Sequence, residues 1–340
     1  MVIGVFAVAV AACGIIAHRA GVLPGSTQAS ADSAKVASPV FRITSLAWPQ
    51  EALGLAATGT EVLWEQRHRS AAIAGLWSYD VRTRLSERLL GHRATGTVAG
   101  SLSASGDIIV WRAWPGRRGV GSPSIRGYDR TNSRRWTVAE QGRDPTIAGD
   151  TLIWVERHGA GATDDAIRGI DKVTDEEYSI PADGRVRDVA ARGSWVAWIS
   201  RRGEDSAVWA GSYRRAKRRQ LAAGGSAIAI NRDRVVWATD VGRRSIAIVS
   251  WDRRSGNSKV LCRLVGAASS LAINRDFAVW VTTREATGPQ VWAYDFKRDR
   301  SFPVSANAGE QASPVIVAGT VFWADRRSGE WELYARTLEP

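Results

Sequence analysis

The sequence repeats one pattern seven times, and this repeat constrains the fold more than any other feature. Each copy places a tryptophan in a short apolar run that follows a tight turn, at spacings of 47, 43, 44, 39, 43 and 43 residues. The seven positions are Trp64, Trp111, Trp154, Trp198, Trp237, Trp280 and Trp323. A fixed period of about 40 to 50 residues is typical of architectures in which each copy is one supersecondary unit.

Each copy contains four short strand-like segments, which we call a to d. A small-residue segment and a turn come first, and the tryptophan segment follows; Ala-Ile-Asn-Arg-Asp stands before it at both 229–233 and 272–276. A variable arginine-rich loop leads to segment c, and segment d closes the copy. Four-stranded units of this length predict an all-β fold, a seven-bladed β-propeller with antiparallel blades.

Segment c ends in an aspartate in five of the copies. An aspartate at that position can accept hydrogen bonds from the backbone amides of the following turn. The five residues are Asp80, Asp129, Asp171, Asp252 and Asp295.

The two ends of the repeat region predict how the ring closes. The last copy reaches Pro340 after segment c, and an additional strand-like stretch at 39–46 precedes the first copy. We expect this N-terminal strand to complete the last blade, because open edges would leave unpaired backbone groups exposed. A six-bladed ring with one decorative copy is the alternative.

The 16 tryptophans of the chain are first of all a packing signal. A flat indole buries about 150–250 Å², which suits contact between neighbouring blades. We therefore expect the seven tryptophans of segment b to be buried there. Five other tryptophans lie on or beside segment c. Of the four tryptophans that remain, only Trp114 lies in a b–c loop.

The first 38 residues resemble an export or anchor segment followed by a linker. Residues 2–17 carry no charge, and their length suits a signal-peptide core better than a full membrane span. Val10-Ala11-Ala12-Cys13 resembles a lipobox, which would make Cys13 a lipidation site. A cleaved signal ending near Ala31 and an uncleaved anchor are the alternatives. The predicted organisation is a leader at 1–24, a flexible tether at 25–38 and the propeller at 39–340.

The stretch 309–338 resembles the repeats of TolB-like bacterial propellers, and so does Asp-Pro-Thr-Ile-Ala-Gly-Asp-Thr-Leu-Ile-Trp-Val-Glu-Arg at 144–157. The resemblance extends over about residues 41–340. It implies an exported, extracytoplasmic protein of the cell envelope that binds a partner and does not catalyse a reaction.

Arginines in the b–c loops are the candidate binding residues. The chain has 46 Lys and Arg against 34 Asp and Glu, a net charge of +12, and almost every b–c loop contributes a cation. An arginine-ringed channel mouth would suit a carboxylate, a phosphate or an acidic polymer; ordinary solvated loops are the alternative. The candidate binding residues are Arg69, Trp114, Arg118, Arg157, Arg202, Arg244, Arg284 and Arg327.

A second basic cluster lies in the c–d hairpin of the fourth copy. It consists of Arg214, Arg215, Lys217, Arg218 and Arg219. Such a patch could bind anionic lipid headgroups or an anionic wall polymer, and a solvated hairpin without a partner is the alternative. With export expected, we do not expect nucleic acid as a partner.

Catalytic signatures are missing from the sequence. It contains no GxSxG, HExxH or Walker A motif and no Cys/His cluster, so we expect no metal and no cofactor. The predicted function is a non-catalytic, monomeric binding scaffold of the cell envelope, with a protein or an anionic polymer as partner. The alternative is a propeller enzyme, a lyase or a glycoside-active enzyme, with its site at the channel mouth.

Overall fold

The computed structural model describes the repeat region almost completely. The described residues are 39–44, 54–66, 74–91, 97–114, 122–157, 163–215, 217–242, 244–284, 288–305 and 309–339. Among them, no helix is long and apolar enough to cross a bilayer. The predicted leader and tether, including Cys13, lie outside these residues.

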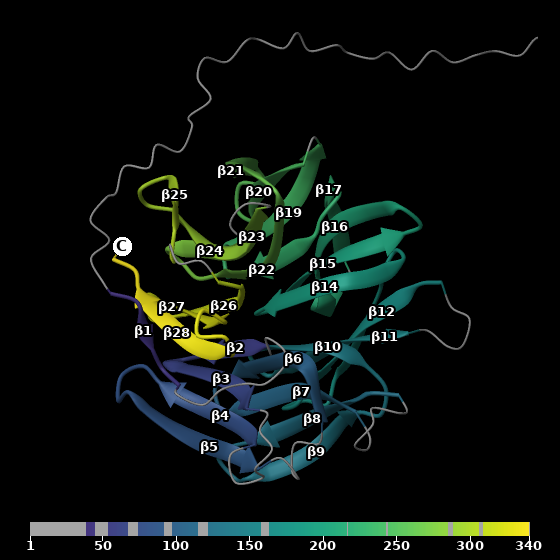
Figure 1. Ribbon diagram of the computed structural model, residues 1–340. Helices are drawn as coiled ribbons and strands as arrows, with labels where there is room; N and C mark the ends of the chain where they lie inside the picture. Colours follow the sequence, from purple (N-terminus) through teal and green to yellow (C-terminus); the bar gives the residue numbers. More distant parts are fainter. Residues whose placement is uncertain are drawn as a thin grey trace, which may run out of the picture. The chain divides into compact units, whose positions relative to one another are not determined.

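The described residues form seven four-stranded antiparallel sheets, which we number as blades 1 to 7. In blades 1 to 6 the strands follow chain order from the centre outward (Figure 1). Blades 1 to 3 are β2 (Leu55–Thr58), β3 (Glu61–Gln66), β4 (Gly75–Asp80) and β5 (Leu85–Gly91); β6 (Thr97–Ser105), β7 (Ile108–Trp114), β8 (Ser124–Asp129) and β9 (Arg134–Ala139); and β10 (Arg143–Ala148), β11 (Thr151–Arg157), β12 (Asp165–Asp171) and β13 (Glu177–Pro181).

Blades 4 to 6 repeat the arrangement, with one short 3-10 helix, η1 (Tyr213–Arg215), in blade 4. They are β14 (Arg185–Arg192), β15 (Trp195–Arg202), β16 (Asp205–Ser212) and β17 (Lys217–Ala223); β18 (Ala227–Ile230), β19 (Arg234–Gly242), β20 (Ser245–Asp252) and β21 (Ser258–Val265); and β22 (Ala267–Ile273), β23 (Phe277–Arg284), β24 (Gly288–Asp295) and β25 (Arg300–Pro303). The first strands of adjacent blades contact one another around the centre, so the fold is a seven-bladed β-propeller.

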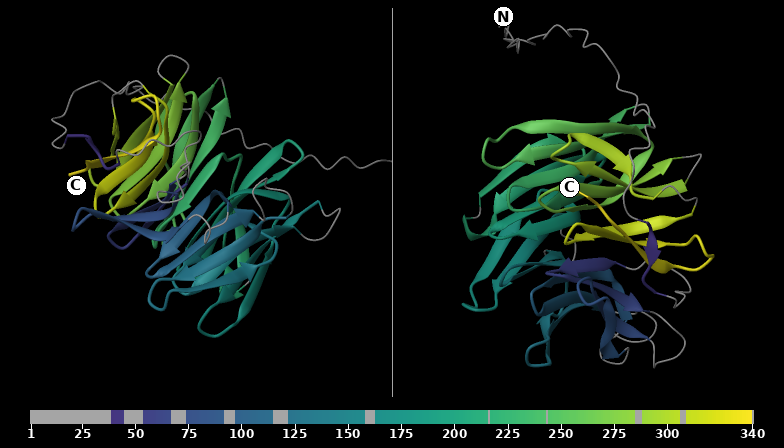
Figure 2. Two further views of the ribbon diagram at one scale, coloured as in Figure 1. Left: turned by 60° about the horizontal axis from the view of Figure 1, so that its bottom comes forward. Right: turned by 90° about the vertical axis from the view of Figure 1, so that its left-hand side faces the viewer.

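Blade 7 is built from both ends of the repeat region. Its order is β26 (Gln311–Val317), β27 (Thr320–Asp325), β28 (Glu332–Thr337) and then β1 (Phe41–Arg42). Phe41 pairs with Ala335, the Ile43 amide donates to the Leu333 carbonyl over 2.8 Å, and the purple β1 lies beside the yellow β28 in Figures 1 and 2. The predicted closure by an N-terminal strand is confirmed, although the regular strand is shorter than 39–46.

The core is divided into clusters that each join two neighbouring blades. Trp280 of blade 6 is fully buried against Ile248 and Leu264 of blade 5, and Trp323 of blade 7 is fully buried against Val279 and Val291 of blade 6. Six of the seven strand-b tryptophans are at most 2% exposed and pack in this way. The interpretation of the tryptophan repeat as a blade-packing signal therefore holds for these six.

Trp154 is the exception among the strand-b tryptophans. It is only half-buried, and the cluster that joins blades 2 and 3 contains four buried residues, none of them aromatic. The first strand of blade 3 is bulged opposite Trp154, since Arg143 pairs with Val155 and Thr146 with Ile153. The same kind of bulge lies opposite the fully buried Trp280 and Trp323, so the small cluster at this seam, and not the bulge, distinguishes Trp154.

The aspartates that end strand c cap the following turns, as predicted. Asp252 accepts from the amides of Arg254 and Ser255 over 3.0 and 2.8 Å, and the other four aspartates accept equivalent bonds. The amide of Ser255 is the main cause of a lowered pKa at Asp252. These bonds fix the c–d turns on one face of the propeller.

Candidate functional site

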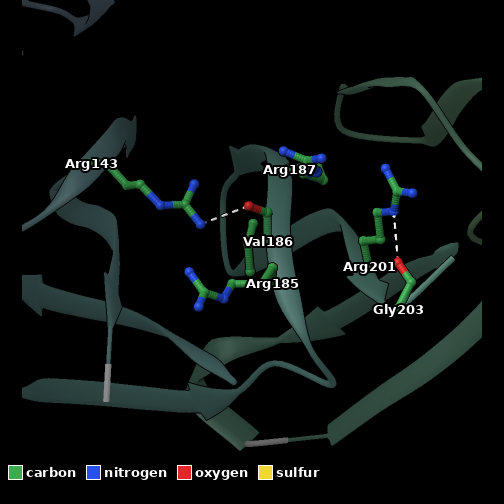
Figure 3. A pocket seen from close by; sticks show the side chains of 6 residues that line it. All are labelled: Arg143, Arg185, Val186, Arg187, Arg201 and Gly203. Carbon is green, nitrogen blue, oxygen red and sulfur yellow. Dashed lines mark hydrogen bonds between the residues drawn. The ribbon is translucent and has the colours of Figure 1, made fainter. Parts of the chain in front are cut away.

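A cavity of about 580 Å³ opens between blades 3 and 4, on the face that carries the b–c and d–a turns. Four arginines line it, together with one valine and one glycine, from β10, β14, β15 and the turn after β15. The lining residues are Arg143, Arg185, Val186, Arg187, Arg201 and Gly203 (Figure 3). We refer to it as the arginine pocket.

Arg143 holds the two blades together. Its guanidinium donates to the Asp165 carboxylate and to the Val186 carbonyl, both over 2.6 Å, and it also pairs with Asp144. Asp165 is buried and accepts the Val186 amide over 2.7 Å. The Arg143–Asp165 ion pair thus binds the peptide groups on both sides of Val186. Arg143 therefore has a structural role at the edge of the pocket.

Arg185 and Arg201 have the same charge and stand directly opposite each other on β14 and β15. Such a cross-strand pair is unfavourable by itself, because facing like charges repel. The Nε–H group of Arg201 donates a hydrogen bond to the Gly203 carbonyl over 2.8 Å, and this bond orients the guanidinium. Arg185 has no ion pair or side-chain hydrogen bond with any described residue.

Arg187 occupies a bulge in the innermost strand of blade 4. The register moves from Val186 opposite Ser200 to Asp188 opposite Ile199, so Arg187 has no partner position on β15. A bulge of this kind turns a side chain out of the regular alternation. Arg187 is exposed and, like Arg185, makes no ion pair within the described residues.

A titratable carboxyl follows Arg187 directly. Burial raises the pKa of Asp188 to about 7, with the nearby Asp144 charge acting in the same direction and the Ile228 amide opposing it. The Ile228 amide donates to the Asp188 carboxylate over 2.9 Å and so links blade 4 to blade 5. A carboxyl with this pKa exchanges its proton near neutral pH.

Most of the described arginines predicted from the b–c loops are engaged within the protein. Arg202 bonds Asp164 and Asp183, each over 2.8 Å. Arg284 lies 4.8 Å from the Trp292 ring centre, and Arg327 pairs with Asp325 and lies 4.1 Å from the Tyr334 ring centre.

The remaining predicted site residues lie apart from this group. Arg112 covers the ring of Trp114, with 4.8 Å between the guanidinium and the ring centre. Arg157 is exposed at the end of β11, and Arg244 is exposed between β19 and β20. Arg69 and Arg118 lie outside the described residues.

None of the four pocket arginines is among the candidate binding residues predicted from the sequence, and three of them lie outside the b–c loops from which those candidates were drawn. Arg143, Arg185 and Arg187 lie at the start of first strands instead, after the d–a turns. A signal was present: Gly-Arg occurs at 142–143 and again at 184–185, at equivalent places in blades 3 and 4.

No metal or reactive-thiol site is found in the part of the chain that the structure describes. No group of three or more His, Cys, Asp or Glu side chains is placed to hold a metal ion there. Cys262 is half-buried, and burial raises the pKa of its thiol to about 12. It therefore stays protonated and weakly nucleophilic at neutral pH.

Comparison with known proteins relates the chain to other propellers by shape. No protein-family model matches the sequence, and no curated protein matches it. An oligogalacturonate lyase in complex with manganese is 14% identical, with a TM-score of 0.61 over 90% of this chain and 94% of that chain. The β-propeller domain of the Trilobed protease from Pyrococcus furiosus is 10% identical, with a TM-score of 0.60 over 87% and 94% of the two chains.

A third solved structure, a puromycin hydrolase mutant complexed with PGG, is 15% identical, with a TM-score of 0.61 over 85% of this chain and 53% of that chain. At these identities the similarity establishes the fold, a β-propeller. Function has to be argued from the site.

Proposed function

We propose that the protein is an exported binding scaffold that holds a carboxylate- or phosphate-bearing group of a protein or envelope polymer in the arginine pocket. One observation carries the proposal: four arginines line one pocket, and two of them, Arg185 and Arg187, make no ion pair with any described residue. An anion placed in this pocket would accept charge-assisted hydrogen bonds from these side chains, which are about twice as strong as neutral ones.

The size and the walls of the pocket support a small acidic group as ligand. Its volume of about 580 Å³ falls in the range of small-molecule sites, roughly 300–1,000 Å³. Several nearby carboxylates are already engaged, since Asp165 and Asp144 pair with Arg143 and Asp164 pairs with Arg202. Planar guanidinium groups suit bidentate contact with a carboxylate.

Ligand binding by matched variants tests the proposal. We expect Arg185→Gln/Arg187→Gln to weaken binding of trigalacturonate at least tenfold in isothermal titration calorimetry, because each lost charge-assisted bond contributes about 1.5–3 kcal/mol. Arg82→Gln/Arg84→Gln removes two exposed arginines of the same spacing from the opposite face and should leave binding unchanged. Equal affinities for the acid and its methyl ester would refute the proposal.

A second candidate function, acid–base chemistry on a bound acid, is favoured by Asp188. Its pKa of about 7 is close to the optimum for a general base, and it follows a pocket arginine directly in the chain. One structural neighbour is an oligogalacturonate lyase. Turnover of trigalacturonate by the protein, abolished in Asp188→Asn with binding retained, would identify an enzyme; binding without turnover would identify a scaffold.

A further inference from the structure

The c–d hairpin of blade 4 is anchored by a buried tyrosine at its turn. Tyr213 of η1 is buried, donates its hydroxyl to the Gly193 carbonyl over 2.5 Å and contacts Thr151 of blade 3 over 3.1 Å. Its ring meets Tyr178 edge-on at 5.1 Å. The basic residues that follow Tyr213 are therefore presented by an anchored hairpin.

Three of the five cations in this hairpin have partners inside the protein. Arg214 pairs with Asp171 over 3.2 Å, Arg218 donates to the Pro181 carbonyl over 2.6 Å, and Arg219 lies 5.9 Å from the Trp251 ring centre.

Arg215 and Lys217 are different from these three. Both are exposed, and neither has an ion pair or hydrogen-bond partner among the described residues. Among the described residues, Arg214 is the one cation of this hairpin with an ion pair, to Asp171 at the end of β12 in blade 3, and the two tip cations are available to a partner.

The chain enters the propeller on the same face as this hairpin. β1 runs antiparallel to β28, and Phe41 pairs with Ala335 while Arg42 pairs with Tyr334. Since strand c ends at the c–d turn, β1 begins at the c–d end of blade 7, near the C-terminus marked in Figure 1. The tether predicted at 25–38 therefore joins the face that carries the basic hairpin, opposite to the arginine pocket.

The entry point and the hairpin are well separated around the ring. One belongs to blade 7 and the other to blade 4, three blades away. The 21 residues from 18 to 38 have a root-mean-square length of roughly 25 Å if flexible. An anchor at residues 2–17 would thus keep this face near the bilayer, and a second contact at blade 4 would fix its orientation.

We propose that the hairpin tip, Arg215 and Lys217, docks on an anionic lipid surface, which turns the c–d face toward the membrane and the arginine pocket away from it. Each basic residue near such a surface contributes about a fivefold gain in partitioning, and salt screens the attraction. The orientation rests on the proposed export and tethering, whereas the pocket's ligand binding does not depend on it.

Hydrogen exchange of the full chain on vesicles tests the docking. On vesicles with 30% phosphatidylglycerol, we expect slower exchange in peptides that contain 213–219 than on pure phosphatidylcholine vesicles, and reversal of this protection at 0.5 M salt. Peptides of the b–c face, such as 201–205, should exchange equally on both.

Charge reversal provides the matched control. Arg215→Glu/Lys217→Glu should abolish the protection and lower partitioning at least tenfold, whereas Arg157→Glu/Arg263→Glu, an equal change toward the other face, should keep the protection. Absence of protection at 213–219, protection of the b–c face, or protection by soluble polyglutamate without lipid would each overturn the proposal. Trigalacturonate binding by the same variants reports separately on the pocket.

Discussion

Two neighbouring residues of β14 experience opposite electrostatic conditions. Arg187 lies in an exposed bulge, where its charge is solvated, whereas the carboxyl of Asp188 is enclosed and bonded to the Ile228 amide. A protonated Asp188 avoids the cost of an enclosed negative charge. The single step along the chain from Arg187 to Asp188 therefore combines an anion-binding group with a group that titrates near neutrality.

We expect Asp188→Asn to change the pH dependence of stability. The folded pKa of about 7 exceeds the unfolded value of about 4, so the folded state holds the extra proton between these values and its stability falls as pH rises toward 7. In urea unfolding, the variant should lose this decline and be more stable than the parent protein at pH 7.5, by up to about 4 kcal/mol. Parallel pH profiles for the two proteins would contradict the assignment.

The blade seams, the contacts between adjacent blades, are the elements that the sequence predicted well. The spacing of the tryptophans predicted the buried indoles between blades, and the aspartates that end strand c predicted the capped c–d turns. Both features depend on short, repeated stretches of sequence, and the structure contains both. The half-buried Trp154 was not predicted, since its burial depends on how few buried side chains the folded blades 2 and 3 bring together at their seam. The partners of Arg202 also escaped prediction, because Asp164 and Asp183 come near it only in the folded blades.

Tryptophan substitutions at two seams should have unequal effects. Trp280→Ala removes a fully buried indole and should lower the free energy of unfolding by about 3–5 kcal/mol through the cavity that it leaves. Trp154→Ala affects the seam between blades 2 and 3, where the side chain is half-buried, and should cost about half as much. Chemical denaturation of both variants measures the difference, and equal losses would show that the seams are equivalent.

At the scale of the whole molecule, the seven blades depend on one short closing strand. The sequence predicted that the ring closes through its N-terminal strand, but it did not predict how few residues would pair. β1 has two residues in regular pairing with β28, and the Arg42–Glu332 ion pair extends the contact. The bonds of Ile43 and Thr44 to Leu333 extend it further.

A pair of truncations tests the closure. A chain that begins at residue 38 retains β1 and should unfold cooperatively at nearly the temperature of the full chain. A chain that begins at residue 46 leaves the edge of β28 unpaired, and it should unfold several degrees lower and self-associate through the open edge. Calorimetry and light scattering give both readouts; indistinguishable proteins would mean that β1 is dispensable.

The direction of β1 also determines how the fold would carry a mechanical load. A pull on residue 39 acts along the strand axis toward the c–d face, while a ligand held in the arginine pocket would resist from the other face. The β1–β28 hydrogen bonds would then be loaded in shear, all at once, and not opened one after another. The rate of ring opening under force, which governs forced unfolding, would therefore depend on the number of residues in this short strand.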